Sequence, residues 1–357
     1  MEVEVNHNQQ KINPINQNSF REEDLHVDVH EINNHSESLR VGGTNTFLAF
    51  KNETTYTIAS NGRWLKIIQY GREAFEDRLP YPHKNLSHPP VYSDLLNCFF
   101  YVSMNKLYRK DFNNKSSRVC LTLGTLGNLT YSSAHQKLIL FTGWKNIAVV
   151  DVIEMRVELM IQYSRCNQIL IDSIFLDEKE DRLLSVSKSG DIFLFVFNQK
   201  MRKLLALNQD KISFIQERLE EVTGFAVCKK SQHFLVVVGE AMLYSSRMII
   251  FKISGKNLVQ EQILDLGGLQ NPIVCAVEST GYFGSHILWI GVEKNYLGYI
   301  QVYDYSLELE TKSLRILEKK KIEHKEKQPI GISRFGDALY YTGWFGKVMK
   351  ISLVLQC

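Results

Sequence analysis

The sequence has few of the residues that interrupt β-structure or build disulfide frameworks. It contains only 7 prolines and 6 cysteines in 357 residues, and the cysteines include no Cys-x-x-Cys pair. Scattered cysteines beside apolar residues predict buried free thiols in a reducing compartment. No apolar run approaches the ~18 residues that a membrane-spanning helix needs, and the polar N-terminus predicts no secretory signal. We therefore expect a location inside the cell, in the cytosol or nucleus.

The sequence also lacks the familiar catalytic and cofactor-binding motifs. It has no G-x-S-x-G nucleophile elbow, no phosphate-binding G-x-x-x-x-G-K-[ST] and no H-E-x-x-H zinc motif. Among the 10 histidines, His26 and His30 lie close together in a polar stretch, where solvated side chains are expected more often than a rigid metal site. We predict no catalytic residues, no cofactor and no metal, and hence a protein that is not an enzyme.

The charge is low overall but uneven along the chain. Residues 1–40 hold eight acidic and three basic residues, so the net charge of +3 leaves +8 on the remainder. Residues 1–24 are rich in Asn, Gln and Glu with almost no apolar periodicity, which predicts a disordered acidic tail. Residues 25–357 form the single predicted domain.

Short apolar runs around tight turns recur throughout that domain. Residues 137–152 contain one such pair of runs around Thr142-Gly143-Trp144, and residues 339–354 repeat it around Thr342-Gly343-Trp344. Two β-rich runs around a Gly-containing turn predict a hairpin. With the aromatic share of 11%, the recurrence predicts an all-β repeat protein.

Seven such units divide the domain, at a mean of about 45 residues each, close to the ~40–45 residues of a four-stranded propeller blade. The predicted blades are residues 44–85, 86–125, 126–166, 167–215, 220–268, 270–325, and 327–357 together with 25–32. We therefore predict an all-β, seven-bladed β-propeller.

Some strand endings carry a family resemblance. The runs Ile147–Asp151 and Ile300–Asp304 each end an apolar strand with Asp, and Ser189-Gly190-Asp191 has the form of a middle hairpin turn. These features resemble WD-repeat β-propellers, although neither Asp follows a Trp and no unit begins with Gly-His. The resemblance implies a rigid interaction scaffold that belongs to a larger complex.

The ends of the domain predict how the ring closes. The last unit stops after its third strand, while Leu25–Val29 alternates apolar and polar residues before the first unit. This spare strand could complete the last blade and remove an exposed sheet edge.

Three groups of residues are candidates for function. Trp144 and Trp344 occupy turns between second and third strands, where they either pack between blades or form a binding hot spot. The basic run 312–327 includes Lys319, Lys320 and Lys321, interleaved with acidic residues, and is either a solvated outer strand or a contact for an acidic protein, lipid or nucleic acid. Asp94 and Asp172 are the carboxylates expected on inner strands, where some propeller hydrolases hold a metal.

Taken together, these features predict a non-catalytic protein–protein interaction scaffold within a multi-subunit assembly. The alternatives are a propeller-type metal-dependent hydrolase and a binder of anionic lipid or nucleic acid through the basic run. Neither the pattern nor the resemblance identifies the partner proteins.

Overall fold

The computed structural model of the chain contains 28 β-strands and no helix among the residues that it describes. The described residues are 25–31, 46–60, 64–70, 72–78, 89–103, 105–112, 118–122, 126–142, 146–162, 170–176, 179–187, 189–198, 203–211, 220–228, 233–240, 245–254, 257–265, 270–277, 286–294, 297–308, 313–323, 329–335, 338–343 and 348–355. The predicted tail, residues 1–24, lies outside them.

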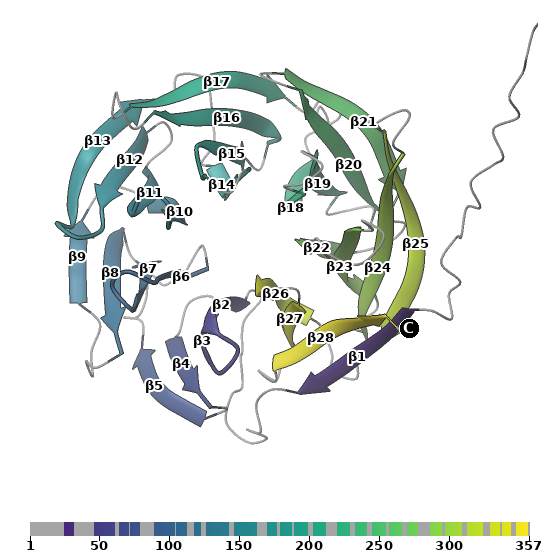
Figure 1. Cartoon of the computed structure of the whole chain (residues 1–357), viewed down its shortest axis with the longest axis horizontal. Helices are drawn as coiled ribbons and strands as arrows, with labels where there is room; N and C mark the ends of the chain where they lie inside the picture. The colour runs from purple at the N-terminus through teal and green to yellow at the C-terminus, as the bar shows by residue number, and fades with distance from the viewer. Residues whose placement is uncertain are drawn as a thin grey trace, which may run out of the picture.

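The described strands form seven antiparallel sheets of four strands each, arranged as a ring (Figure 1). The first sheet comprises β2 (Thr46–Asn52), β3 (Thr55–Ser60), β4 (Trp64–Gln69) and β5 (Arg72–Arg78). The second comprises β6 (Val91–Ser93), β7 (Cys98–Ser103), β8 (Lys106–Asp111) and β9 (Arg118–Thr122). The third comprises β10 (Leu126–Ser132), β11 (Lys137–Thr142), β12 (Asn146–Asp151) and β13 (Arg156–Gln162).

The remaining sheets follow in chain order. The fourth comprises β14 (Leu170–Phe175), β15 (Arg182–Ser187), β16 (Asp191–Asn198) and β17 (Lys203–Lys211). The fifth comprises β18 (Glu220–Cys228), β19 (His233–Glu240), β20 (Ser245–Ser254) and β21 (Asn257–Asp265), and the sixth β22 (Gln270–Val277), β23 (His286–Lys294), β24 (Leu297–Glu308) and β25 (Ser313–Glu323). The seventh joins β26 (Pro329–Phe335), β27 (Ala338–Gly343) and β28 (Val348–Leu355) to β1 (Leu25–Glu31).

The innermost strand of each sheet contacts the innermost strands on both sides, and β26 contacts β2. The contacts between innermost strands therefore form a closed ring. At the seam between the seventh and first sheets, the rings of Phe50 and Tyr340 lie 4.4 Å apart, and Tyr56 joins the same buried cluster. The predicted all-β propeller fold is confirmed.

The outermost strands share an irregularity that β1 does not have. Six of them carry one extra residue against their neighbour, at Ala74, Cys120, Glu158, Leu207, Glu261 and Lys319. A bulge of this kind increases the local twist of a strand. In contrast, β1 pairs with β28 over seven consecutive residues without a shift, from Leu25 opposite Leu355 to Glu31 opposite Met349.

The hydrophobic core lies between neighbouring sheets and not at a single centre. In β11, Leu138 and Leu140 belong to the cluster shared with the second sheet, whereas Ile139 and Phe141 belong to the cluster shared with the fourth. Both faces of this strand are therefore buried, which explains its uninterrupted apolar run.

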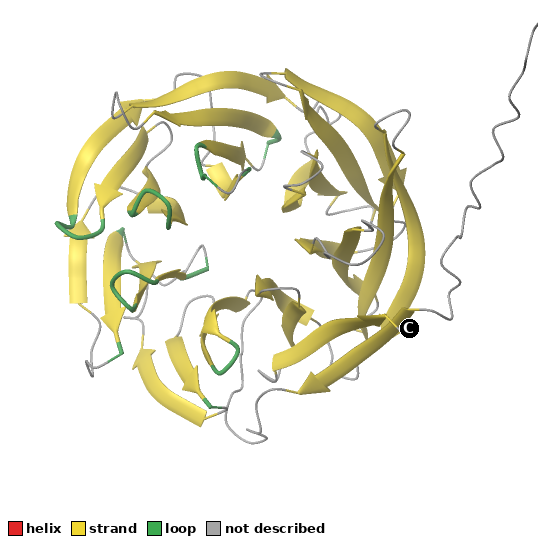
Figure 2. Ribbon diagram, viewed as in Figure 1, coloured by secondary structure: helices red, strands yellow, loops and turns green. Residues whose placement is uncertain are grey.

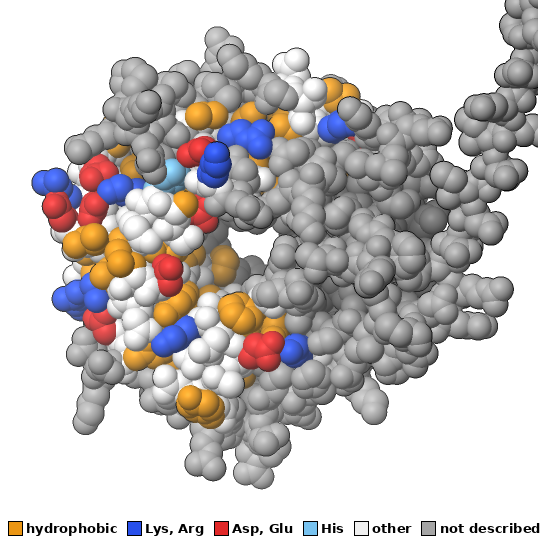
Figure 3. All heavy atoms as spheres, viewed as in Figure 1, with side chains coloured by type: hydrophobic (Ala, Val, Ile, Leu, Met, Phe, Trp, Pro, Cys, Tyr) orange, Lys and Arg blue, Asp and Glu red, His pale blue; other side chains and the backbone are white. Residues whose placement is uncertain are grey.

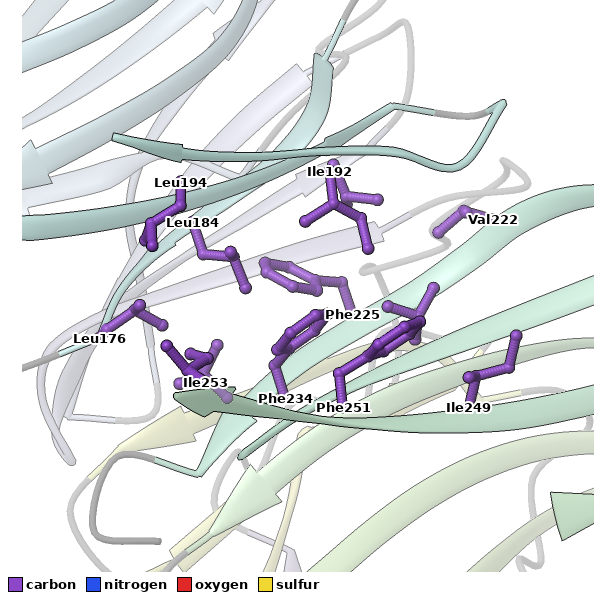
Figure 4. Packing of buried hydrophobic residues seen from close by; sticks show 13 residues of the cluster. Leu176, Leu184, Ile192, Leu194, Val222, Phe225, Phe234, Ile249, Phe251 and Ile253 are labelled. Carbon is purple, nitrogen blue, oxygen red and sulfur yellow. The ribbon is translucent and has the colours of Figure 1, made fainter. Parts of the chain in front are cut away.

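The cluster between the fourth and fifth sheets shows how this packing works (Figure 4). Phe234 is fully buried and stacks on Phe251, with ring centroids 4.7 Å apart and ring planes 5° from parallel. Phe225 meets Phe234 edge-on at 6.4 Å. Aromatic pairs in such arrangements add to the energy of area burial.

Candidate interaction surface

The two predicted contact tryptophans lie outside the described residues. Trp144 belongs to the connection between β11, which ends at Thr142, and β12, which begins at Asn146. Trp344 directly follows β27. Their role, packing or binding, stays a prediction.

The predicted lysines Lys319, Lys320 and Lys321 lie in β25, the outermost strand of the sixth sheet. Lys320 is opposite Val302 and Lys321 is opposite Gln301, so these two lysines occupy register positions on opposite faces of the sheet. Lys319 is the extra residue of this strand. The side chains of these three residues are outside the described part, and their binding role also stays a prediction.

One of the two carboxylates expected on inner strands is placed differently by the structure. The prediction for Asp94 was wrong, because β6 ends at Ser93 and Asp94 begins the four-residue turn to β7. Asp172 does lie in an innermost strand, β14. Among the described residues, no group of three or more His, Cys, Asp or Glu could hold a metal ion.

Antiparallel order brings two turns of every sheet to the same end. The turn between its first and second strands and the turn between its third and fourth strands both lie at one edge of the ring. We call the described residues of these turns the turn rim: 53–54, 70, 94–97, 112, 133–136, 152–155, 176 and 179–181. Figure 2 marks these turns in green, and Figure 3 shows the side chains on the corresponding face.

Hydrogen bonds along the turn rim connect neighbouring sheets. Lys350 of the seventh sheet binds Glu53 of the first at 2.8 Å. Lys51 of the first sheet donates to the Asn97 amide oxygen of the second at 2.7 Å. Polar side chains therefore fasten the seventh, first and second sheets together.

The second and third sheets are joined through Tyr131. Its hydroxyl lies 3.1 Å from the Asp94 carboxylate and accepts a hydrogen bond from Ser93 at 3.2 Å. Burial, reinforced by the Asp94 charge, raises the pKa of Tyr131 to about 12. The phenol therefore stays protonated at neutral pH and acts as a structural donor.

Glu180 joins the third and fourth sheets. Its carboxylate accepts hydrogen bonds from the Ser132 hydroxyl at 2.7 Å and the Ala134 amide at 2.8 Å. The buried His135 side chain lies 3.2 Å from the carboxylate of Asp181. Sequence reasoning missed this cluster, because its members are more than 40 positions apart and no local pattern relates them.

Asp151, the residue of the family resemblance, closes β12 and caps the turn that follows. Its carboxylate accepts the backbone N–H groups of Ile153 at 2.9 Å and Glu154 at 2.8 Å, and it binds the Lys137 ammonium. Burial opposes its ionisation, but these donors outweigh burial and lower the pKa of Asp151. Lys137 also binds Glu158 at 3.0 Å, and the two carboxylates outweigh burial and raise the pKa of Lys137.

Comparison with known proteins gives a fold likeness only. No family model matches the chain, and no curated protein matches it. Among solved structures, the N-terminal domain of Nup159 is similar with a TM-score of 0.57 and 11% identity, covering 92% of this chain and 95% of that chain.

Two further structures give comparable matches. A chain in the S. cerevisiae structure of Dbp5 bound to Nup159, Gle1, IP6 and ADP has a TM-score of 0.58 and 11% identity, covering 93% of this chain and 96% of that one. The β-propeller domain of Myceliophteria thermophila Cps50 (Swd1) has a TM-score of 0.59 and 12% identity, covering 88% and 97%. At these identities the likeness establishes the propeller fold alone.

Within the part of the chain that the structure describes, no helix has the length and hydropathy needed to cross a membrane.

Proposed function

We propose that this chain is a non-catalytic interaction scaffold and a subunit of a larger intracellular assembly, in the cytosol or nucleus. The observation that carries the proposal is that polar side chains of the turn rim bind groups on neighbouring sheets. Glu53, Asp94, Asn97 and Glu180 all bind partners on a neighbouring sheet. Such bonds make a rigid platform, which a binding surface needs so that little entropy is lost on association.

The structural neighbours support the same role. One of them is a chain from a structure in which Dbp5 is bound to Nup159 and Gle1. A propeller of this kind offers many turns on a rigid ring, and turns on rigid scaffolds commonly carry binding residues.

We further propose that the chain is a divergent WD-repeat propeller. Asp151 ends the third strand of its sheet, as the family resemblance requires, and its carboxylate binds the turn that follows. At the β15–β16 turn, Asp191 accepts hydrogen bonds from Ser187 at 3.1 Å and Ser189 at 2.8 Å, and Gly190 takes the positive φ of 82°. These contacts support a turn-stabilising role for Asp151 and Asp191, which belong to the WD-repeat resemblance.

The scaffold proposal is tested by isolating the tagged full-length chain from its own cells at near-native expression. We expect it to sediment well above its monomer mass of 41.3 kDa, with a few proteins co-purifying in stoichiometric amounts. Metal analysis of the same sample is the control for the hydrolase alternative. A monomeric chain that holds a stoichiometric metal ion and hydrolyses a phosphate or carboxylate ester would overturn the proposal.

A further inference from the structure

Tyr70 is the most exposed large apolar residue in the described part of the chain, at 81% exposure. It lies in the turn between β4 and β5, where Gln69 pairs with Arg72 and leaves a two-residue loop of Tyr70 and Gly71. No side-chain hydrogen bond, ion pair or ring contact of Tyr70 is found with the described residues. An aromatic ring that is exposed to this extent buries little area in its own chain, so it contributes little to the stability of the fold.

The backbone of Tyr70 also adopts a conformation that is unfavourable for tyrosine. Tyr70 has φ of 51°, in the left-handed region that glycine adopts freely and that most L-residues, Asn and Asp excepted, disfavour. Two-residue loops of this kind favour Asn before Gly, because Asn tolerates positive φ. Tyr at this position is therefore a poor choice for folding.

Of the five other non-glycine residues with positive φ, Asn105 is of the residue type that tolerates this region, and the remaining four use their side chains within the fold. Asn97 accepts a hydrogen bond from Lys51, and Gln136 bonds to Tyr131 at 2.7 Å. Glu180 binds the turn of the third sheet, and Met155 packs on the cluster between the second and third sheets. Among the described residues of this set, Tyr70 is the one that disfavours positive φ and has an exposed side chain with no contact to the described part of the fold. Strain that the fold does not use points to function.

A carboxylate that is exposed to solvent lies close to Tyr70. The Tyr70 amide donates to the Thr54 carbonyl at 2.7 Å, which places Tyr70 beside the turn that holds Glu53. Glu53 is 57% exposed, whereas its partner Lys350 is only 17% exposed. The carboxylate therefore reaches solvent, while the ammonium lies beneath it.

The neighbouring turn of the second sheet also holds an exposed apolar side chain next to an exposed carboxylate. Leu95 is 49% exposed and follows the exposed Asp94, while the ammonium of Lys51 lies 4.7 Å from the centre of the Phe112 ring. Two exposed cations, Arg118 and Arg156, begin outermost strands, and each lies within 4 Å of a carboxylate. The exposed Lys179 lies on the turn rim of the fourth sheet. We call Glu53, Thr54 and Tyr70 the tyrosine patch.

We propose that the tyrosine patch docks an arginine-containing segment of a partner protein. An arginine side chain would stack its planar guanidinium on the Tyr70 ring and pair with the Glu53 carboxylate. Tyr is enriched at the centres of protein interfaces, where it supplies contact area at low entropic cost. The inference rests on the proposed scaffold function and names the chemistry of one of its partners.

The test compares two substitutions at one position in the full chain. Tyr70→Asn removes the ring but gives the turn its preferred Asn-Gly sequence, so the melting temperature should stay the same or rise. Tyr70→Phe keeps the ring. Val259→Asn is the matched control, since Val259 is 49% exposed on β21. The probe is a fluorescein-labelled peptide of alternating glycine and arginine, and the reference is its glycine–glutamate counterpart.

We expect the arginine peptide to bind the wild type, Tyr70→Phe and Val259→Asn alike, and Tyr70→Asn about tenfold more weakly. Equal binding by wild type and Tyr70→Asn, or no preference over the glutamate peptide, would overturn the proposal. A dimer of the wild type that Tyr70→Asn dissociates would also overturn it, because the occupant would then be a second copy. If the native partners still co-purify with Tyr70→Asn, the tyrosine patch is wrong and the scaffold proposal stands. If none co-purifies with the wild type, the scaffold proposal itself fails.

Discussion

Replacing Asp151 should unfold the propeller at a measurably lower denaturant concentration, because one carboxylate serves two structural purposes. One oxygen accepts the N–H groups of Ile153 and Glu154, and the other binds Lys137. Losing a carboxylate that caps backbone N–H groups costs about 1 kcal/mol. The ion pair is mostly buried, with 17% and 16% of the two side chains exposed, and losing it costs roughly 1 kcal/mol more.

We therefore expect Asp151→Ala to lower the free energy of unfolding by about 2 kcal/mol. Asp151→Asn keeps an oxygen for the turn and should lose about half of that. Glu154→Ala is the control, because Glu154 is exposed and a surface pair contributes below ~1 kcal/mol. Urea unfolding followed by tryptophan fluorescence measures all three. An Asp151→Ala midpoint no lower than that of Glu154→Ala would refute the reasoning.

The same pair predicts a pH dependence. The pKa of Asp151 is lowered by folding, so its contribution is present above its unfolded pKa of ~3.9 and is lost as pH falls through the folded pKa. The pKa of Lys137 is raised, so its contribution is present below ~10.4 and is lost as pH rises through the folded pKa. The difference in stability between wild type and Asp151→Asn should therefore be constant from about pH 5 to 9 and shrink below about pH 4.

Three further predictions test the packing, the closure and the tryptophans. Phe234→Ala should destabilise the chain by roughly 3–5 kcal/mol in urea unfolding, because the ring is fully buried between Phe225 and Phe251, whereas the exposed Val259→Ala should change it by less than ~0.5 kcal/mol. Deleting residues 1–32 removes β1 and exposes the β28 edge, so it should lower the melting temperature and promote aggregation, while deleting 1–20 should do neither; equal melting temperatures would contradict the role of β1. Trp144→Ala and Trp344→Ala should either lower the melting temperature, if the rings pack between blades, or leave it unchanged while co-purified partners are lost.

Much of the fold could be predicted because the propeller repeats one pattern. The run Leu138–Phe141 reads as a buried strand, and its alternate residues indeed serve two different interfaces. The sequence could not say which interface each residue serves, since both faces of the strand are apolar. That assignment depends on the curvature of the whole ring.

The candidate site was much harder to predict. Asp94 was expected on an inner strand because the run Val91 to Leu95 was assigned as the first strand of its unit, but the turn with Asn97 at φ of 48° ends β6 after three residues. Leu95 is consequently an exposed turn residue and not part of the core. Glu180 and Ser132 meet only because two sheets lie side by side. Local patterns do not contain such contacts.

The closing strand shows where a local pattern does decide the structure. In six sheets the outermost strand follows its neighbour through a connection in the chain, and an extra residue adjusts its register. No such connection ties β1 to β28, so the alternating sequence of the strand has to specify the register. Leu25, Val27 and Val29 stand opposite Leu355, Leu353 and Ile351, while Asp28 stands opposite Ser352. A slip by one residue would turn every apolar residue of β1 to the opposite face. The alternation of apolar and polar residues in β1 therefore specifies how this strand pairs with β28. In the other sheets, the turn before the outermost strand specifies the pairing.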